Sequence, residues 1–321
     1  MSQIQNPILP GFFPDPSICR VGDDYYLANS SFEWFPGVPL HHSRDLMNWR
    51  FAGHALTRKS QLDLRGVPDS AGVWAPSLSY ADGQFWLVYT NLRNTGMGRP
   101  FKDLEIFLTT APDIAGPWSE PVELNSVGFD PSLFHDDDGR KWLVNMLWDF
   151  RKGMDRFAGI VIQEYNPETR KLVGPMRKIL EKTGILTEGP NLYKRDGWYY
   201  LMLAEGGTGW NHGISMARSR TILGPYELDP QTSVLTSRDD ATLLLQKAGH
   251  GELVETSAGE WYLAHLASRP LKTAAGRNLA SPDKTPSAEA HAGDRCVLGR
   301  ETCLQRVEWR DGWLRLAGGG T

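Results

Sequence analysis

The sequence contains a repeat with a nearly constant period. Five segments share one pattern: an opening residue, a short alternating run, a polar turn with glycine or aspartate, one or two aromatic residues, and a leucine. The anchoring leucines, separated by 60, 56, 58 and 62 residues, are Leu27, Leu87, Leu143, Leu201 and Leu263. Self-similarity at a fixed period is typical of solenoids and propellers, so it constrains the whole fold.

Each repeat predicts one blade of a β-propeller. The polar turn joins two strand-like runs as in a hairpin, and a second, weaker pair of runs follows in most repeats. Four short strands per repeat, in five repeats, match a five-bladed propeller. The 33 Gly, 21 Pro and 34 aromatic residues also favour turns and strands over helices. We therefore predict an all-β fold, a five-bladed β-propeller with an axial active-site pocket. The alternative is an irregular all-β domain whose hairpins share only turn chemistry.

The domain prediction is a single propeller over residues 1–321. One segment, 272–295, interrupts the repeat without contributing an aromatic residue, and we predict a long loop there. Such a loop is either a lid or a simple insertion.

Charge and hydropathy exclude several classes of partner. The net charge is −4 with no basic block, so we expect no nucleic-acid binding. The first residues lack a basic, apolar leader, and no stretch approaches 18 apolar residues, so we expect no membrane span and a cytoplasmic location. The three cysteines have no CxxC spacing and indicate neither a disulfide framework nor a zinc site. Self-association into a homo-oligomer stays open.

The first residue of each repeat carries the chemical information. In a propeller the innermost strands line the central channel, so equivalent positions of different blades converge near the axis. The positions 12 or 13 residues before the anchoring leucines are Asp15, Ala75, Asp130, Gly189 and His250. Trp74 precedes Ala75, and Glu188 precedes Gly189. Three carboxylates, a tryptophan and a histidine are therefore expected to face one cavity.

Converging carboxylates shift each other's proton affinities apart, as acid and base catalysis requires. Hydrolysis of a glycoside with inversion needs one ionised carboxylate to activate water and one protonated carboxyl for the leaving oxygen, about 6.5–9.5 Å apart. The alternative for Asp15 and Asp130 is a structural Asp-Pro turn. The matched register of Asp15, Asp130 and Glu188, with His250 in a further repeat, favours the catalytic interpretation.

Aromatic residues near these positions are candidates for stacking on a sugar ring: Phe32, Trp34, Trp74 and Trp148. Each alone fits core or blade packing better, because large aromatics dominate cores, but their association with the charged positions favours a sugar site for the group. Other histidines, which we interpret as structural or exposed, are His41, His42, His212 and His265. Residues 136–139 resemble the start of a calcium loop but lack its later glutamate, so we predict a hairpin turn.

These residues stand in motifs that resemble the family 43 glycoside hydrolases, and specifically the β-xylosidases that also cleave α-L-arabinofuranosides. The resemblance covers essentially the whole chain. It includes NPILPGFFPDPS around Asp15, GVWAPSLSYADGQFWLVYT around Trp74, GFDPSLFHDDDGRKWLVNMLWD around Asp130, TEGPNLY around Glu188, AGHGELVE around His250 and LGRETCLQ around Arg300.

The resemblance implies roles for the site residues. Asp15 would be the general base, Glu188 the general acid, and Asp130 the carboxylate that orients Glu188 and tunes its proton affinity. Arg300 would keep Asp15 ionised and bind sugar hydroxyls. Phe32, Trp74 and Trp148 would line the subsite for the non-reducing sugar. His250 would lie at the channel floor, where some relatives hold a calcium ion through water; we predict no metal here and no required cofactor.

The functional expectation is an inverting exo-β-1,4-xylosidase that releases xylose from the non-reducing end of xylooligosaccharides, with α-L-arabinofuranosidase activity as a side reaction. The alternatives are a dedicated α-L-arabinofuranosidase or arabinan-degrading enzyme, and a non-catalytic or inactive carbohydrate-binding propeller. Relatives of this branch carry a C-terminal β-sandwich, one loop of which closes the pocket, and this chain ends where that domain would begin.

Overall fold

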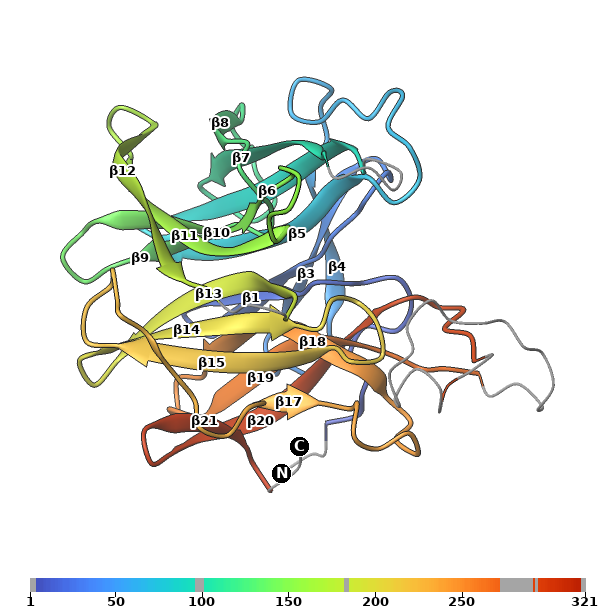
Figure 1. Ribbon diagram of the computed structural model, residues 1–321. Coiled ribbons are helices and arrows are strands. Elements are labelled where there is room, and N and C mark those ends of the chain that lie inside the picture. Colours follow the sequence, from blue (N-terminus) through green and yellow to red (C-terminus); the bar gives the residue numbers. More distant parts are fainter. Residues whose placement is uncertain (1–3, 96–100, 182–184, 272–290, 292–293, 319–321) are drawn as a thin grey trace.

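The structure, a computed structural model, describes residues 4–95, 101–181, 185–271, 291 and 294–318. Within these ranges the chain forms 21 β-strands in five antiparallel sheets (Figure 1). No helix in the same ranges is long and apolar enough to cross a bilayer. The strands of each sheet follow one another in sequence order, as in a propeller blade. The predicted five-bladed β-propeller is therefore confirmed.

Each blade takes its strands from one repeat. The first blade contains β1 (Ser17–Val21), β2 (Asp24–Ala28), β3 (Gly37–Ser43) and β4 (Arg50–Leu56). The second contains β5 (Gly72–Ala81), β6 (Gln84–Asn94), β7 (Asp103–Ala111) and β8 (Val122–Asn125). The third contains β9 (Ser132–His135), β10 (Lys141–Trp148), β11 (Phe157–Asn166) and β12 (Lys171–Leu180).

The last two blades complete the circle. The fourth contains β13 (Thr187–Arg195), β14 (Trp198–Glu205), β15 (Gly213–Ser219) and β16 (Glu227–Leu228), with β17 (Leu235–Thr236) also paired to β15. The fifth contains β18 (Gln246–Glu255), β19 (Trp261–Ser268), β20 (Glu301–Arg310) and β21 (Trp313–Leu316). The predicted loop at 272–295 falls mostly outside the described residues, and the single-domain assignment of residues 1–321 stays a prediction.

The anchoring leucines of the repeat hold neighbouring blades together. Each lies in the second strand of its blade and is at most 1% exposed. Leu87, for example, packs in a core shared with the first blade, and Leu263 packs in a core shared with the fourth. Burying apolar surface between sheets is the main favourable term in such a fold. The repeated leucine therefore marks the position at which each blade packs against its neighbour.

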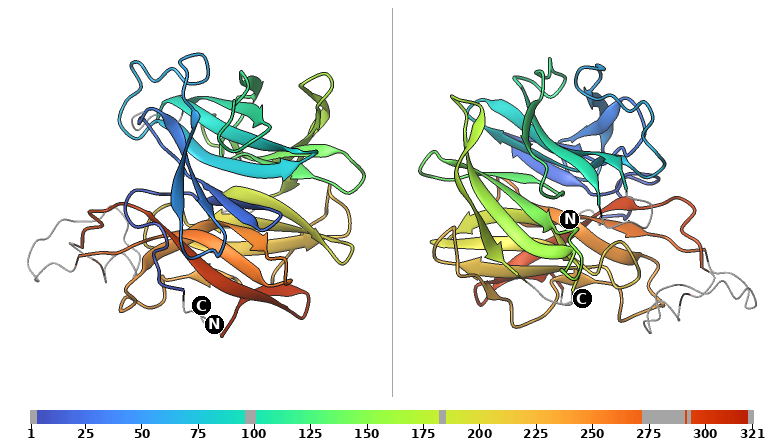
Figure 2. Two further views of the ribbon diagram at one scale, coloured as in Figure 1. Left: turned by 180° about the vertical axis from the view of Figure 1, so that it is seen from behind. Right: turned by 45° about the horizontal axis from the view of Figure 1, so that its top comes forward.

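The innermost strands of the blades, β1, β5, β9, β13 and β18, contact one another in a closed ring. The N-terminal segment closes the outer circle, because Leu9 and Thr302 exchange two backbone hydrogen bonds of 3.2 Å. The backbone N–H of Phe13 also donates to the carbonyl of Arg300, at 3.0 Å. The first and fifth blades thus meet along the segment around Leu9. Figure 2 shows the blades from two further directions. This closure places Arg300 beside the start of β1.

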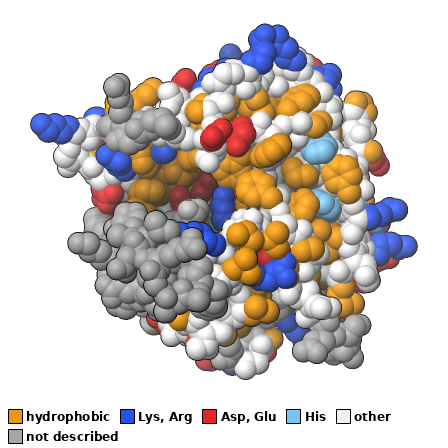
Figure 3. Space-filling view, turned by 90° about the vertical axis from the view of Figure 1, so that its right-hand side faces the viewer, with side chains coloured by type: hydrophobic (Ala, Val, Ile, Leu, Met, Phe, Trp, Pro, Cys, Tyr) orange, Lys and Arg blue, Asp and Glu red, His pale blue; other side chains and the backbone are white. Residues whose placement is uncertain are grey.

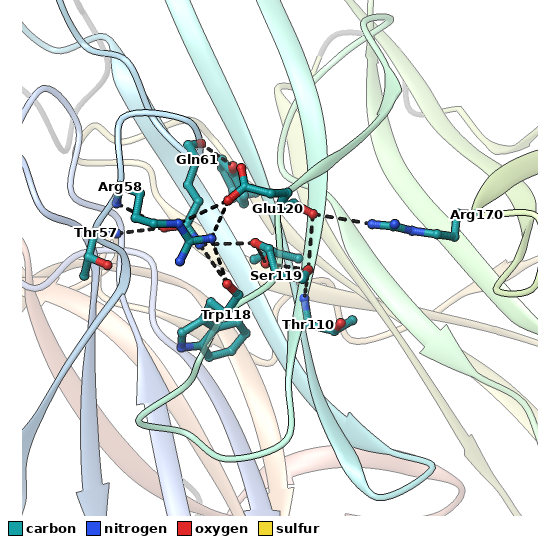
Figure 4. A network of polar contacts seen from close by, with 10 residues as sticks. Thr57, Arg58, Gln61, Thr110, Trp118, Ser119, Glu120 and Arg170 are labelled. Atoms are coloured by element: carbon teal, nitrogen blue, oxygen red, sulfur yellow. Dashed lines mark hydrogen bonds and ion pairs between the residues drawn. The ribbon is translucent and has the colours of Figure 1, made fainter.

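Polar contacts also join blades away from the axis. Arg58, which follows the first blade, donates to the Trp118 carbonyl at 3.0 Å and to the Glu120 carboxylate at 2.6 Å (Figure 4). Buried Gln61 donates to the carbonyls of Trp118 and Ser119. Arg170 of the third blade donates to the backbone of Glu120. These bonds join the connection between β7 and β8 to the first and third blades.

Candidate active site

The five positions that the repeat aligned share one unusual backbone conformation. Asp15, Ala75, Asp130, Gly189 and His250 all have positive φ, at 52°, 29°, 52°, 56° and 38°. Non-glycine residues rarely adopt this region, and such conformations cluster at functional sites. The strand register is also interrupted by bulges beside Ala75, Gly189 and His250. The equivalence found in the sequence therefore corresponds to a repeated backbone feature at the axis.

A cavity of about 480 Å³ opens at this end of the axis. All eight residues predicted for the site line it: Asp15, Phe32, Trp74, Asp130, Trp148, Glu188, His250 and Arg300. Acidic side chains lie in the depth of the hollow, with basic side chains at its edge and hydrophobic ones around it (Figure 3). The cavity is within the usual size of small-ligand pockets.

Asp15 is surrounded by donors and positive charge. Arg300 Nη1 donates to its Oδ1 at 2.7 Å, and the Ser30 hydroxyl donates to its Oδ2 at 2.6 Å. Ser30 in turn accepts the backbone N–H of Ala75, at 2.7 Å. His250 Nδ1 lies 3.5 Å from Asp15 Oδ1. Burial alone would raise the pKa of Asp15, but Arg300, His250 and Ser30 together lower it below the ordinary value. Asp15 is thus held as a carboxylate.

Glu188 has the opposite environment. Its side chain is buried, and burial together with the negative charge of Asp15 raises its pKa to about 7. Arg300 and Lys102 oppose this rise only in part. Within the described part of the chain no hydrogen-bond donor is bound to the Glu188 carboxyl comparable to the pair on Asp15. Glu188 is therefore only partly ionised at neutral pH and mainly protonated below it.

Asp130 lies next to Glu188 and is bound to its backbone. The N–H of Gly189 donates to Asp130 Oδ2 at 3.1 Å. Burial and the charges of Glu188 and Asp15 raise the pKa of Asp130 well above its ordinary value. Glycine at 189 also leaves room for the neighbouring ring, because a Cβ there would lie 2.9 Å from His250 Nε2. Asp130 thus fixes the backbone that carries Glu188.

Aromatic rings form the wall of the cavity. Trp74 packs between Phe32 and Phe129, with ring centroids 6.3 and 5.4 Å away, and Phe129 contacts Trp148 at 5.8 Å. Phe32 is held by two backbone hydrogen bonds with Val73, each 2.9 Å. A Cβ at Gly72, where φ is +85°, would lie 2.1 Å from the Phe32 carbonyl oxygen. Glycine there allows the loop of Phe32 to reach the second blade. The rings offer flat apolar faces to a ligand.

Several residues of the site were not found from the sequence. Ser30 follows β2 and Lys102 precedes β7, so neither stands at the head of a repeat. Lys102 Nζ lies 5.1 Å from the ring centroid of Trp74 and 4.8 Å from that of Trp148. Trp34, a stacking candidate, is 67% exposed and does not line the cavity. Its backbone N–H donates to the Ser31 carbonyl in a turn, and its side chain lines a neighbouring hollow with Phe12 and Glu33.

His212 was interpreted as structural or exposed, and the structure buries it behind His250. Its Nδ1 is 2.9 Å from the Glu205 carbonyl oxygen, and a Cβ at Gly249 would lie 2.1 Å from its ring. Its role is therefore to support the floor. Within the described residues no group of three or more histidine, cysteine, aspartate or glutamate side chains is arranged to hold a metal.

A propeller with an axial pit, in which one carboxyl is held ionised and another protonated, defines a class of acid–base enzyme. The sequence matches the family described as "Glycosyl hydrolases family 43" over residues 4–314. The chain belongs to this family.

Individual relatives agree with this assignment. The chain is 54% identical to "Xylosidase/arabinosidase 43B" of Humicola insolens over 99% of its length and 56% of that protein. It is 50% identical to "Xylan 1,3-beta-xylosidase" of Vibrio sp, over 99% of its length and 58% of that protein. The solved structure of xylan beta-1,4-xylosidase from Bacillus Halodurans C-125 has a TM-score of 0.91 and 58% identity, over 99% of this chain and 57% of that one. The chain thus spans little more than half of these proteins.

Proposed function

We propose that this chain is the catalytic propeller of an inverting exo-β-1,4-xylosidase, which releases xylose from the non-reducing end of xylooligosaccharides. The observation that carries the proposal is the opposite environment of two carboxyls in one cavity: Arg300 and Ser30 are bonded to Asp15, which lowers its pKa, whereas burial and the charge of Asp15 raise the pKa of Glu188. Inverting hydrolysis needs this combination of an ionised base and a protonated acid. A binding propeller has no use for three converging carboxylates.

In the proposed mechanism Asp15 removes a proton from the water that attacks the anomeric carbon, and Glu188 gives its proton to the departing glycosidic oxygen. The water supplies the hydroxyl of the released sugar. Before the next cycle Asp15 returns its proton to solvent, and Glu188 takes up a proton from solvent. Arg300 keeps Asp15 ionised, and Asp130 holds the backbone beside Glu188. Phe32, Trp74 and Trp148 bind the terminal sugar, and His250 supports Asp15 from the floor. A pit admits a chain end, which favours exo action.

The substrate assignment is supported by the names of the relatives, which include a β-1,4-xylosidase, a 1,3-β-xylosidase and a xylosidase/arabinosidase. The second candidate is therefore α-L-arabinofuranosidase activity in the same pit. The test is to compare kcat/KM on β-1,4-xylobiose, β-1,3-xylobiose and an aryl α-L-arabinofuranoside. We expect the highest value on β-1,4-xylobiose. A higher value on the arabinofuranoside would make arabinofuranosidase the main activity, and no hydrolysis of any of them would contradict the proposal.

The remaining proposals concern conditions and partners. We propose that the reaction needs no metal, so activity should survive dialysis against EDTA. We also propose a cytoplasmic location, no nucleic-acid or membrane partner, and leave self-association to be measured by light scattering. A loss of activity in EDTA that calcium restores would contradict the first of these.

A further inference from the structure

A buried ion pair adjoins Arg300 in the sequence but does not line the pit. Arg269, which follows β19, donates from Nε to Glu301 Oε2 at 2.7 Å and from Nη2 to Glu301 Oε1 at 2.8 Å. The Glu301 side chain is fully buried, whereas that of Arg269 is partly exposed. A buried carboxylate needs such a partner, because an unpaired charge is very costly to remove from water. The two-pronged geometry of the pair also fixes the relative positions of the strands that carry it.

Glu301 ties together three segments of the chain around Arg300. Its Oε1 also accepts the backbone N–H of Gly11, at 2.7 Å. Gly11 lies two residues before Phe13, whose N–H donates to the Arg300 carbonyl at 3.0 Å. The Glu301 carboxylate therefore joins the end of β19, the start of β20 and the N-terminal segment that leads to Asp15.

The segment that leads to Asp15 is also fastened to Thr302. The Thr302 hydroxyl donates to the Phe13 carbonyl at 2.7 Å, and Asn29 Nδ2 donates to the same carbonyl at 3.1 Å. Both Asn29 and Thr302 are fully buried. An arginine side chain has many rotamers, so it holds a fixed hydrogen bond only where its backbone is fixed relative to its partner. The bonds around β20 meet this condition for Arg300, which lies 2.7 Å from Asp15 Oδ1.

We propose that the Arg269–Glu301 pair is a positioning clamp, which fixes the guanidinium of Arg300 against Asp15 and thereby keeps the base ionised. The inference rests on the proposed function, since it takes Asp15 as the base. It gives two residues outside the pit a part in setting the pH range of activity. The other titratable groups that interact electrostatically with Asp15 lie on other elements: His250 of β18, His212 before β15, Glu188 of β13 and Asp130 before β9.

A second ion pair of the same build provides a matched control. Asp229, which is also buried, accepts two N–H groups of Arg315 and the backbone N–H of Gln231. This pair joins the fourth blade to the fifth, and neither of its members lines the pit. Glu301→Gln and Asp229→Asn therefore remove comparable buried charges. Each should lower the free energy of unfolding, but only Glu301→Gln should affect the base.

The first measurement is the pH profile of kcat/KM on xylobiose. In Glu301→Gln the bond between Arg300 and Asp15 is loosened, so the acid limb should move to higher pH by about 0.5–1 unit. Complete loss of a charge-assisted hydrogen bond corresponds to about one to two units. Asp229→Asn should leave the limb in place. Because the clamp acts through Arg300, Glu301→Gln should add no shift to that of Arg300→Ala. An unmoved limb in Glu301→Gln, an equal shift in Asp229→Asn, or a full further shift in the Arg300→Ala background would overturn the proposal.

A stability measurement needs no activity and so separates this inference from the proposed function. The free energy of unfolding in urea is compared for Asp15 and Asp15→Asn chains between about pH 3 and 6. A carboxyl whose pKa is lower in the folded than in the unfolded chain adds stability as pH rises, so Asp15 should show such a gain. The gain should be smaller in the Glu301→Gln background and unchanged in the Asp229→Asn background.

The possible outcomes of the stability measurement are distinct. An unchanged gain with Glu301→Gln would overturn the clamp even if the wild-type chain hydrolyses xylobiose. A wild-type chain that hydrolyses nothing, but whose gain is reduced by Glu301→Gln alone, would overturn the proposed function and support the clamp on Asp15.

Discussion

The two walls of the pit carry the same kind of residue in opposite states. On the wall built by the first and fifth blades, Asp15 is bonded to Arg300 and Ser30 and faces His250, and its pKa is lowered. On the wall built by the third and fourth blades, Glu188 is buried beside a second carboxyl, and its pKa is raised to about 7. Burial is the largest effect on both walls, so the counter-charge decides the outcome. The wall, and not the type of side chain, makes one carboxyl a base and the other an acid.

The largest expected effect comes from removing either carboxyl. Asp15→Ala should lower kcat on xylobiose and on an aryl xyloside alike by about 10²–10⁴-fold, because both reactions need activated water. Glu188→Ala should cause a similar loss on xylobiose but a much smaller one on the aryl xyloside, whose leaving group needs no proton. Steady-state kinetics on the two substrates measure this difference. An equal loss on both substrates in Glu188→Ala would show that Glu188 is not the general acid. The control is Glu255→Ala, which removes a carboxyl on the surface.

The next largest effect is expected from removing the positive charge of Arg300 beside Asp15. Arg300→Ala leaves Asp15 buried without its main cation, so the pKa of Asp15 should rise above its lowered value. Activity requires the carboxylate, so the acid limb of the kcat/KM profile should move to higher pH. A pH profile between 3 and 9 measures the limb, with Arg306→Ala as the control for loss of a surface arginine. An acid limb at the wild-type position would contradict the role given to Arg300.

Changes on the wall that carries Glu188 should move the alkaline limb of the kcat/KM profile. In the wild-type chain kcat/KM should decline as pH rises through about 7, because Glu188 then loses its proton. Lys102 lowers the pKa of Glu188, so Lys102→Met should move this alkaline limb to higher pH. The exposed Lys178→Met serves as control. A shift to lower pH, or a shift of the acid limb instead, would show that Lys102 does not act on Glu188.

The smallest effect is expected at Ser30, a positioning residue. Ser30→Ala removes the donor to Asp15 and leaves the Ala75 N–H buried without a partner, a loss of about 1–3 kcal/mol in unfolding free energy. Chemical denaturation measures that loss. If Ser30 also tunes the base, the acid limb should move to slightly higher pH, and Ser30→Thr should restore both properties. A destabilised variant with a wild-type pH profile would leave Ser30 a purely structural role.

The sequence predicted the blades and the positions at the axis because both obey the repeat. Leu27 and its equivalents must occupy the same site between blades, so counting back from them reached Asp15, Asp130 and His250. Lys102 was missed because it lies in the connection between β6 and β7, whose path no repeat specifies. Trp34 stands close to Phe32 in the sequence but occupies a turn and does not line the pit. The repeat therefore predicts which residues lie on the strands at the axis. Which loop residues line the pit can be seen only in the structure.

Proton NMR of xylobiose hydrolysis tests most directly whether Asp15 and Glu188 act as base and acid from opposite walls of the pit. It records which anomer of xylose is released before mutarotation. If Asp15 activates water on one face while Glu188 protonates the oxygen on the other, α-xylose appears first and Asp15→Ala releases none. If β-xylose appears first, water and leaving group share a face, and the assignment of base and acid to opposite walls is wrong.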